Sequence, residues 1–311
     1  MMVYKEANTP IHRMNAMPKI IWAITILILS LIFDNPVVLI LLFVATIPPA
    51  VFGKIIKEWS FFVKFGLFFI PVIVLLNIAF NHNGEHILYS LGYDLPFFGS
   101  PVITLEALFY GIMMGVRLLV ILSAFAIITV SVHPDDILML MLKMKVPYKS
   151  VLIVSLSSRF IPTLLSDVET ITDVQRTRGL ELDRGSIIKR IKNRVPVLVP
   201  LLANSLERSV EIAEAMEARA FGENKKRTFY KELKLSNADK LVSVFIFSTL
   251  LVGIIARFLG YGIYEYYPVL SPIELESIIL GVLLFSMLVI PYVSVWITYN
   301  FSEPLAHGGH Q

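Results

Sequence analysis

The sequence predicts an all-α fold: a polytopic membrane helix bundle of about six spans, interrupted by one large cytoplasmic helical insertion. Hydrophobic residues make up 56% of the 311 residues and charged residues only 16%, whereas soluble domains average about 45–50% and about 25%. The apolar residues form long blocks, as expected for a chain dissolved in lipid. The basic residues are also concentrated, with 18 of the 27 Lys and Arg between positions 143 and 234, beside 11 acidic residues.

Six apolar stretches predict the membrane helices, in the order 18–33, 36–52, 60–80, 105–132, 241–261 and 273–296. A helix needs about 20 apolar residues to cross the hydrocarbon core, so the first two stretches are short. We expect these two to form a tight helical pair that turns at Asp34-Asn35-Pro36.

The distribution of basic residues predicts the orientation of the chain. Lys and Arg concentrate in the cytoplasmic loops of membrane proteins. They occur in the N-terminal arm, near residue 54 and in the insertion, but connections 81–104 and 262–271 have none. We therefore expect both termini to be cytoplasmic. The expected organisation is membrane helices at 1–132, a cytoplasmic segment at 133–239, and membrane helices with a tail at 240–311.

Several classes of protein are disfavoured by what the chain lacks. It has no cysteine, which excludes disulfides, thiolate metal sites and a cysteine nucleophile. A polar arm precedes the first apolar stretch and no small-residue cleavage pattern follows it, so we expect no cleavable signal peptide. We find no internal repeat, whereas stand-alone secondary carriers usually contain repeated halves.

The insertion is patterned as helices rather than as a loop. Its first part, 134–142, predicts a short amphipathic helix. Apolar residues at helical spacing predict two longer amphipathic helices, at 163–178 and 200–221.

Both longer helices end with an arginine near a glycine, Arg178 before Gly179 and Arg219 before Gly222. A cation at a helix C-terminus stabilises the helix by about 0.3–1 kcal/mol, and this local role alone accounts for either arginine. The alternative is that both arginines project into acidic recesses of another protein, because a guanidinium stays charged and pairs bidentately with carboxylates. Because both helices end with an arginine near a glycine, we favour docking of the two helix ends on another protein.

An ordered set of short motifs runs along nearly the whole chain: Pro10-Ile11-His12-Arg13, Pro18-Lys19, Gly115-Val116-Arg117-Leu118-Leu119, His133-Pro134-Asp135-Asp136-Ile137-Leu138 and Val146-Pro147, with the most specific being Ser158-Arg159-Phe160-Ile161-Pro162, Gln175-Arg176-Thr177-Arg178-Gly179 and Glu214-Ala215-Met216-Glu217-Ala218-Arg219-Ala220-Phe221-Gly222. With this set of motifs, the chain resembles the transmembrane T component of energy-coupling factor (ECF) transporters.

The resemblance implies an energy-transducing subunit of an ECF-type ABC importer. Such a subunit couples ATP hydrolysis by two partner ATPases to uptake of a vitamin or metal ion, which a separate membrane subunit (the S component) binds. The insertion would then be a coupling-helix segment of a cell-membrane protein, with partners in the lipid bilayer and the cytoplasm and no nucleic acid.

The family's coupling helices end in X-Arg-X motifs, most often Ala-Arg-Gly, that dock into grooves on the ATPases. By resemblance, the motifs here are Thr177-Arg178-Gly179 and Ala218-Arg219-Ala220. Thr177 and Ala220 depart from the commonest pattern. Because alanine adopts positive φ less readily than glycine, we expect the second turn to close later, at Gly222.

The sequence predicts no catalytic site in this chain. It contains no G-x-x-x-x-G-K-[ST] loop, and Gly53-Lys54 lacks the required neighbours. We therefore expect no cofactor here and expect ATP and Mg²⁺ on the partner ATPases. The alternative function is a membrane-embedded lipid-modifying enzyme, but Asp135-Asp136 has no second copy of the kind that holds a diphosphate through Mg²⁺.

Ionisable residues inside spans are functional suspects. We expect Lys64 and Glu106 to snorkel from span ends, and Arg257 to snorkel or pair locally. Arg117 lies deeper, where a structural pair within the bundle is favoured over a substrate contact.

Two further features leave alternatives open. Gly111 and Gly115 allow close helix contact, which serves either internal packing or the substrate subunit. His82 and His86 share a loop with Glu85; a solvated loop is favoured over metal capture, and we expect no metal site. The substrate, the number of S components and the identity of the two ATPases are not encoded in these patterns.

Overall fold

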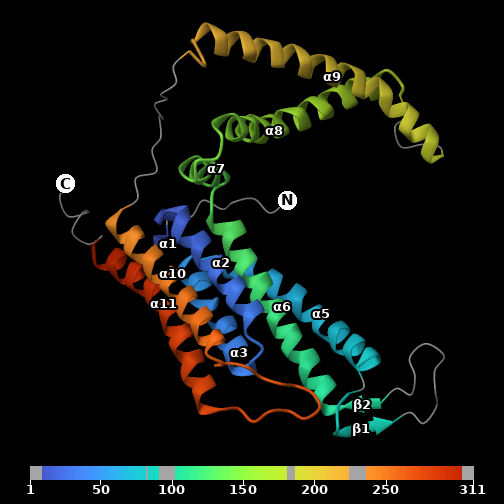
Figure 1. Cartoon of the computed structure of the whole chain (residues 1–311). Helices are drawn as coiled ribbons and strands as arrows, with labels where there is room; N and C mark the ends of the chain where they lie inside the picture. The colour runs from blue at the N-terminus through green and yellow to red at the C-terminus, as the bar shows by residue number, and fades with distance from the viewer. Residues whose placement is uncertain (1–8, 82, 91–101, 181–185, 224–235, 303–311) are drawn as a thin grey trace. The chain divides into compact units, whose positions relative to one another are not determined.

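The computed structural model describes residues 9–81, 83–90, 102–180, 186–223 and 236–302. The chain forms two compact units, one of Met1–Ile137 with Leu233–Gln311 and the other of Leu138–Glu232. The prediction of an all-α membrane bundle is confirmed, because the described residues form helices apart from one short antiparallel strand pair (Figure 1).

The first unit contains all six of the predicted membrane helices. Its elements are α1 (Pro10–Arg13), α2 (Ala16–Ile32), α3 (Pro36–Ala45), α4 (Ile47–Phe52), α5 (Ile56–Phe80), β1 (Ile87–Ser90), β2 (Val102–Thr104), α6 (Leu105–Ser131), α10 (Asn237–Phe258) and α11 (Leu275–Ser302). The helix α7 (Pro134–Lys143) follows α6 and leads into the second unit.

Helix α2 lies at the centre of this unit, packed against α6 and α10. Its side chains Trp22, Ile26 and Leu29 are fully buried. The Trp22 indole donates to the Leu288 carbonyl of α11 at 3.3 Å, and its ring meets Tyr292 edge-on. The buried face of this short helix therefore packs on protein, while Ile24 and Leu31 are exposed.

The hairpin of α2 and α3 ends well short of the end of α6 that begins at Leu105. At one end of α2, Lys19 bonds to Ser131, the last residue of α6; just past its other end, the Phe33 carbonyl bonds to Arg117. Arg117 lies 12 residues after Leu105, where α6 begins, so the turn is about 18 Å short of that end. The chain between α10 and α11 packs on this remaining part of α6, where Tyr264 and Tyr266 are buried.

Helices α5 and α6 lie side by side, with β1 and β2 at their shared end (Figure 1). A Cβ atom at Gly111 would lie 2.9 Å from the Val74 Cα, and one at Gly115 would lie 2.8 Å from the Ile70 side chain. The two glycines therefore lie where α6 meets α5 within this chain. Gly66 is the one buried residue of α5, whose remaining side chains are wholly or partly exposed.

Five described helices are long and apolar enough to cross a membrane: α5, α6, α8, α10 and α11. The pair formed by α2 and α3–α4 is apolar but shorter. Helix α8 belongs to the segment that was expected to lie in the cytoplasm. Its length and composition are nevertheless those of a membrane-spanning helix.

The second unit is built on two long helices, α8 (Tyr148–Thr177) and α9 (Ile187–Ala218). The predicted starts at residues 163 and 200 were wrong, because Pro162 lies inside α8, and Pro196 and Pro200 lie inside α9. A proline removes one backbone hydrogen bond and kinks a helix, but it does not end a helix whose flanking turns hold.

Candidate functional site

The two long helices of the second unit end in the same backbone motif. At the end of α8, the Gly179 amide donates to the Arg176 carbonyl at 2.9 Å, and the Leu180 amide donates to the Gln175 carbonyl at 3.0 Å. These are the paired bonds of a Schellman motif, in which a left-handed residue follows the helix. Gly179 is that residue, with φ of 85°, as the sequence predicted.

The end of α9 repeats this arrangement. The Ala220 amide donates to the Glu217 carbonyl at 2.8 Å, and the Phe221 amide donates to the Met216 carbonyl at 3.0 Å. The left-handed residue is Ala220, with φ of 55°. The expectation that the turn would close later was therefore wrong, although Gly222 also has a positive φ, of 102°. The bonds that satisfy the terminal carbonyls hold Ala220 in a conformation that costs a non-glycine residue about 1–2 kcal/mol.

Both arginines occupy the C-cap position with nearly the same backbone angles. Arg178 has φ −82° and ψ 6°, and Arg219 has φ −92° and ψ 15°. Both side chains are exposed, and neither guanidinium has a hydrogen bond or ion pair to the part of the chain that the structure describes. Arg176, in contrast, pairs with Asp173 at 3.6 Å.

The residues beside the arginines complete the two helix ends. Thr177 is the last residue of α8, and its hydroxyl donates to the Val174 carbonyl at 2.7 Å. Ala218 is the last residue of α9. A shallow hollow beside this second end is lined by Ala213, Met216, Glu217, Ala220, Phe221 and Glu223. The surroundings of Arg219 are thus partly apolar and partly acidic.

Contacts across the two helices hold them as a pair. Arg208 of α9 forms an ion pair with Asp167 of α8 at 3.1 Å, and both side chains are partly buried. The Gln175 side chain donates to the Pro196 carbonyl at 3.3 Å. One body of two antiparallel helices therefore presents both arginine ends.

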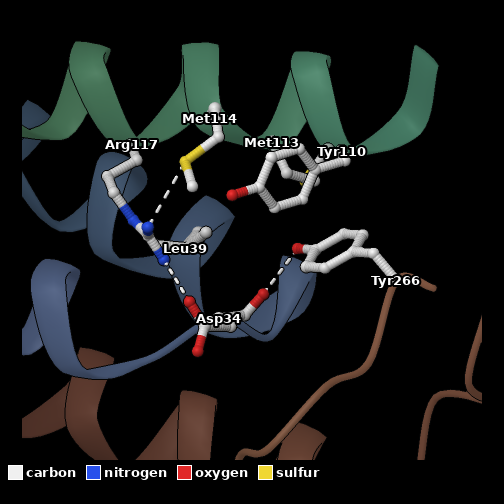
Figure 2. A pocket seen from close by; sticks show the side chains of 7 residues that line it. All are labelled: Asp34, Leu39, Tyr110, Met113, Met114, Arg117 and Tyr266. Atoms are coloured by element: carbon white, nitrogen blue, oxygen red, sulfur yellow. Dashed lines mark hydrogen bonds and ion pairs between the residues drawn. The ribbon is translucent and has the colours of Figure 1, made fainter. Parts of the chain in front are cut away.

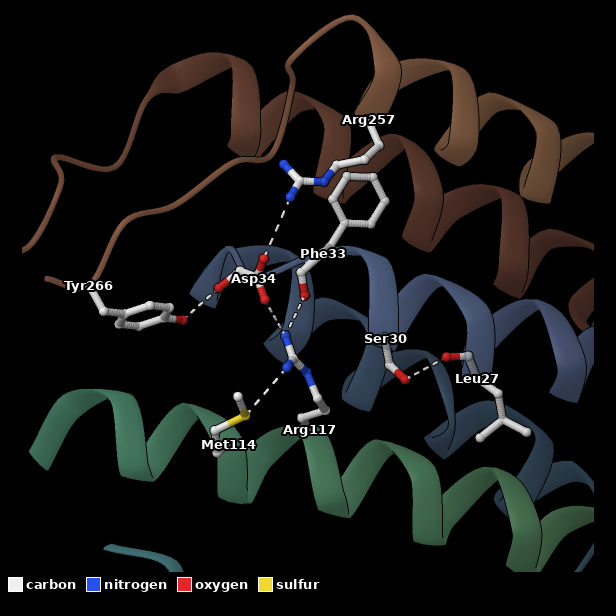
Figure 3. Close-up of polar contacts among 8 residues, drawn as sticks. All are labelled: Leu27, Ser30, Phe33, Asp34, Met114, Arg117, Arg257 and Tyr266. Carbon is white, nitrogen blue, oxygen red and sulfur yellow. Dashed lines mark hydrogen bonds and ion pairs between the residues drawn. The ribbon is translucent and has the colours of Figure 1, made fainter. Parts of the chain in front are cut away.

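A second polar site lies inside the membrane unit, around the turn between α2 and α3 (Figure 2). Arg117 of α6 donates to the Asp34 carboxylate at 2.6 Å and to the Phe33 carbonyl at 2.9 Å. Arg257 of α10 approaches the other carboxylate oxygen of Asp34 at 3.7 Å (Figure 3). The Tyr266 hydroxyl donates to the Asp34 carbonyl at 2.5 Å, and burial raises the pKa of Tyr266, so this hydroxyl stays protonated.

Asp34 therefore joins four segments: its own turn, α6, α10 and the chain after α10. The adjoining cavity is lined by Asp34, Leu39, Tyr110, Met113, Met114, Arg117 and Tyr266 (Figure 2) and has a volume of about 10 Å³. That volume accommodates one water molecule and no larger ligand. Sequence reasoning treated Asp34 only as a turn residue, although an acid within an apolar stretch was a usable signal.

The remaining ionisable residues of the spans divide between the surface and the interior. Lys64 is exposed on α5. The expectation that Glu106 snorkels was wrong, because its side chain is fully buried. The carboxylate accepts bonds from the His86 ring at 2.6 Å and from the His86 amide at 3.2 Å, so the loop folds over it.

The loop histidines form no recognisable metal site in the described part of the chain. His82 lies outside the described residues, and His86 contacts a single carboxylate. Among the described residues, no group of three or more His, Cys, Asp or Glu side chains is arranged to hold a metal ion.

Comparison with known proteins identifies the family. A family model described as CbiQ, cobalt transport protein, matches residues 7–230. The energy-coupling factor transporter transmembrane protein EcfT of Lactococcus lactis subsp. cremoris is 30% identical over 262 residues, which cover 80% of this chain and 95% of that protein. EcfT of Streptococcus thermophilus is 32% identical over 267 residues, covering 82% and 96%. The chain is therefore a multi-pass membrane protein of the CbiQ family and belongs to the transmembrane T components of energy-coupling factor transporters.

Proposed function

We propose that this protein couples ATP hydrolysis by two ABC-type ATPases to uptake of a vitamin or metal ion held by a separate S component. The observation that carries the proposal is the repeated helix end: two Schellman motifs, each with an exposed C-cap arginine. A single arginine at a helix end has a local explanation. Two ends that match in backbone geometry provide two equivalent contacts for a pair of ATPases.

Each arginine docks by charge and geometry. A guanidinium presents several N–H donors in a plane and pairs bidentately with a carboxylate. The Schellman turn reverses the chain directly after each arginine, so the side chain projects from the end of the helix. We propose that Thr177, Arg178 and Gly179 form one docking motif, and that Ala218, Arg219 and Ala220 form the other.

The long helices act as levers. Helix α8 has 30 residues and α9 has 32, each about 45–48 Å long at 1.5 Å per residue. The Asp167–Arg208 ion pair joins them, so force applied at Arg178 or at Arg219 reaches both helices. ATP and Mg²⁺ bind to the ATPases in this proposal, because this chain has no phosphate-binding loop.

The proposed orientation places the second unit and both termini in the cytoplasm, where ATP is available. It is supported by the basic residues between positions 143 and 234. The apolar character of α8 favours a second arrangement, in which α8 crosses the membrane. Single cysteines at positions 178 and 219 of this cysteine-free chain distinguish the two: our proposal requires a membrane-impermeant maleimide to label both from the cytoplasmic side.

The decisive experiment is copurification with the ATPases after charge reversal. We expect Arg178→Glu combined with Arg219→Glu to abolish binding of both ATPases and ATP-dependent uptake. The matched control is Lys149→Glu with Lys192→Glu, which makes the same charge change at exposed positions near the other ends of α8 and α9. Retention of both ATPases by the arginine variant would contradict the proposal. Mass spectrometry of the wild-type complex identifies the S component and its ligand.

A further inference from the structure

A buried lysine lies where α2 begins. The Lys19 side chain is 3% exposed, and its ammonium donates to the Ser131 carbonyl at 2.8 Å. Removing an ammonium from water costs several kcal/mol unless other groups compensate. An apolar residue at this position would avoid that cost. The groups around Lys19 that compensate the charge therefore indicate its role.

Those surroundings are negative and come from three other helices. Ser131 is the last residue of α6, where the helix dipole favours a cation. The carboxylates of Asp136, in the first turn of α7, and of Asp239, in the first turn of α10, are near enough to attract the ammonium of Lys19. Asp239 is held in turn, because it accepts the Ser236 amide at 3.2 Å.

Both covalent connections to the second unit run through helices whose groups interact with Lys19, namely α6 with α7 and α10. The chain leaves the membrane unit through α6 and α7, and it re-enters at the start of α10. The covalent paths from the second unit into the membrane unit therefore run through α7, which contains Asp136, and through the start of α10, which contains Asp239. Lys19 attracts an acid at each connection and belongs to α2, the helix at the centre of the core.

We propose that Lys19 is a positioning residue that ties both connections to α2, so that movement of the arginine-tipped helices displaces the centre of the bundle. The inference rests on the proposed function. From Lys19, the buried side chains of α2 lead to Phe33 and to the Asp34 network at the other end of this helix. The ammonium transmits movement because it bonds to α6 and attracts α7 and α10 at a single point.

The absence of cysteine allows a direct test in the assembled complex. Leu259 lies just past the far end of α10 and is 70% exposed, so Leu259→Cys provides a single labelling site. The complex with its ATPases, in lipid nanodiscs, is treated with fluorescein-5-maleimide without nucleotide and with ATP plus vanadate. In the Leu259→Cys background, we expect the labelling rate to change at least about fivefold between the two states, the lower end of typical allosteric couplings.

Lys19→Met keeps the length of the side chain and removes its charge. We expect this variant to bind the ATPases and hydrolyse ATP, but to lose the nucleotide-dependent change in labelling. Lys19→Arg keeps the charge and should recover part of the change. The matched control is Lys57→Met, which removes an exposed lysine from the first turn of α5 and should leave the change intact.

Three results would overturn the inference. The first is a Lys19→Met complex whose labelling rate responds to nucleotide as in the unmodified background. The second is an unmodified complex that hydrolyses ATP without any change in labelling. If Lys19→Met does not assemble, the double variant Asp136→Asn with Asp239→Asn replaces it, because asparagine can still accept the hydrogen bond from the Ser236 amide. The third overturning result is a labelling change in that double variant as large as in the unmodified background. Failure of the proposed function is recognised separately, because the ATPases would then stay bound to the Arg178→Glu, Arg219→Glu variant.

Discussion

Ala220 gives the sharpest prediction about the two helix ends. It occupies the left-handed position that Gly179 occupies at the end of α8, with φ of 55°. Glycine should relieve about 1–2 kcal/mol of strain there, offset by about 0.4–1 kcal/mol because glycine also gives the unfolded chain more freedom. We therefore expect Ala220→Gly to stabilise the end of α9 by about 0.5–1 kcal/mol.

Hydrogen exchange of the full-length protein measures this locally. The Phe221 amide bonds to the Met216 carbonyl across the motif, so its exchange rate reports opening of the turn. A change of 0.5–1 kcal/mol corresponds to about two- to fivefold slower exchange. The control is Ala218→Gly: it makes the same chemical change at the last residue of α9, where glycine has no left-handed strain to relieve, so exchange should not become slower.

The converse change belongs at the other helix end. Gly179 has φ of 85° and open space around its missing Cβ, so Gly179→Ala should destabilise the end of α8 through backbone strain alone. Faster exchange in Ala220→Gly, or equal effects of Ala220→Gly and Ala218→Gly, would refute the argument that backbone conformation controls these ends.

Two further predictions concern the membrane unit. Gly115→Val places atoms against Ile70 and should destabilise the protein by about 1–3 kcal/mol, seen as a lower Tm in detergent; an unchanged Tm would mean that α5 is not held closely against α6. Asp34→Asn leaves Arg117 and Arg257 without a carboxylate and should lower the free energy of unfolding by about 1–3 kcal/mol. The control Glu265→Gln, at an exposed site, should leave stability unchanged. Equal Tm values for the two variants would contradict the role of Asp34 as a junction.

Local patterns were enough to predict most helices and both arginine ends. Hydrophobic periodicity and the Arg178–Gly179 pair depend on residues within a few turns of one another, and the structure has the expected cap there. The same local reasoning failed at Pro162, because one proline was treated as a helix start when the flanking turns sustain a continuous helix. It failed again at Ala220, where hydrogen bonds outweigh the intrinsic preference of alanine.

Long-range contacts escaped the sequence analysis. Lys19 was used only as an indicator of orientation, yet it bonds to a carbonyl 112 residues away. Glu106 was expected to snorkel from a span end, but its side chain is fully buried and accepts a hydrogen bond from His86. A buried charge and a snorkelling charge look alike in sequence, because the difference lies in what the rest of the chain places beside them.

The sequence by itself determined that this chain forms membrane helices, that it carries a basic helical insertion, and that two helices of that insertion end in arginine. Those properties follow from composition and from spacing within single helices. Tertiary structure alone decided that the α2–α3 hairpin stops level with Arg117, that Asp34 joins four segments, and that the buried Lys19 bonds to the end of α6. The physical reason is that burial and pairing of a charge are set by segments distant in the chain, whose approach no local pattern records.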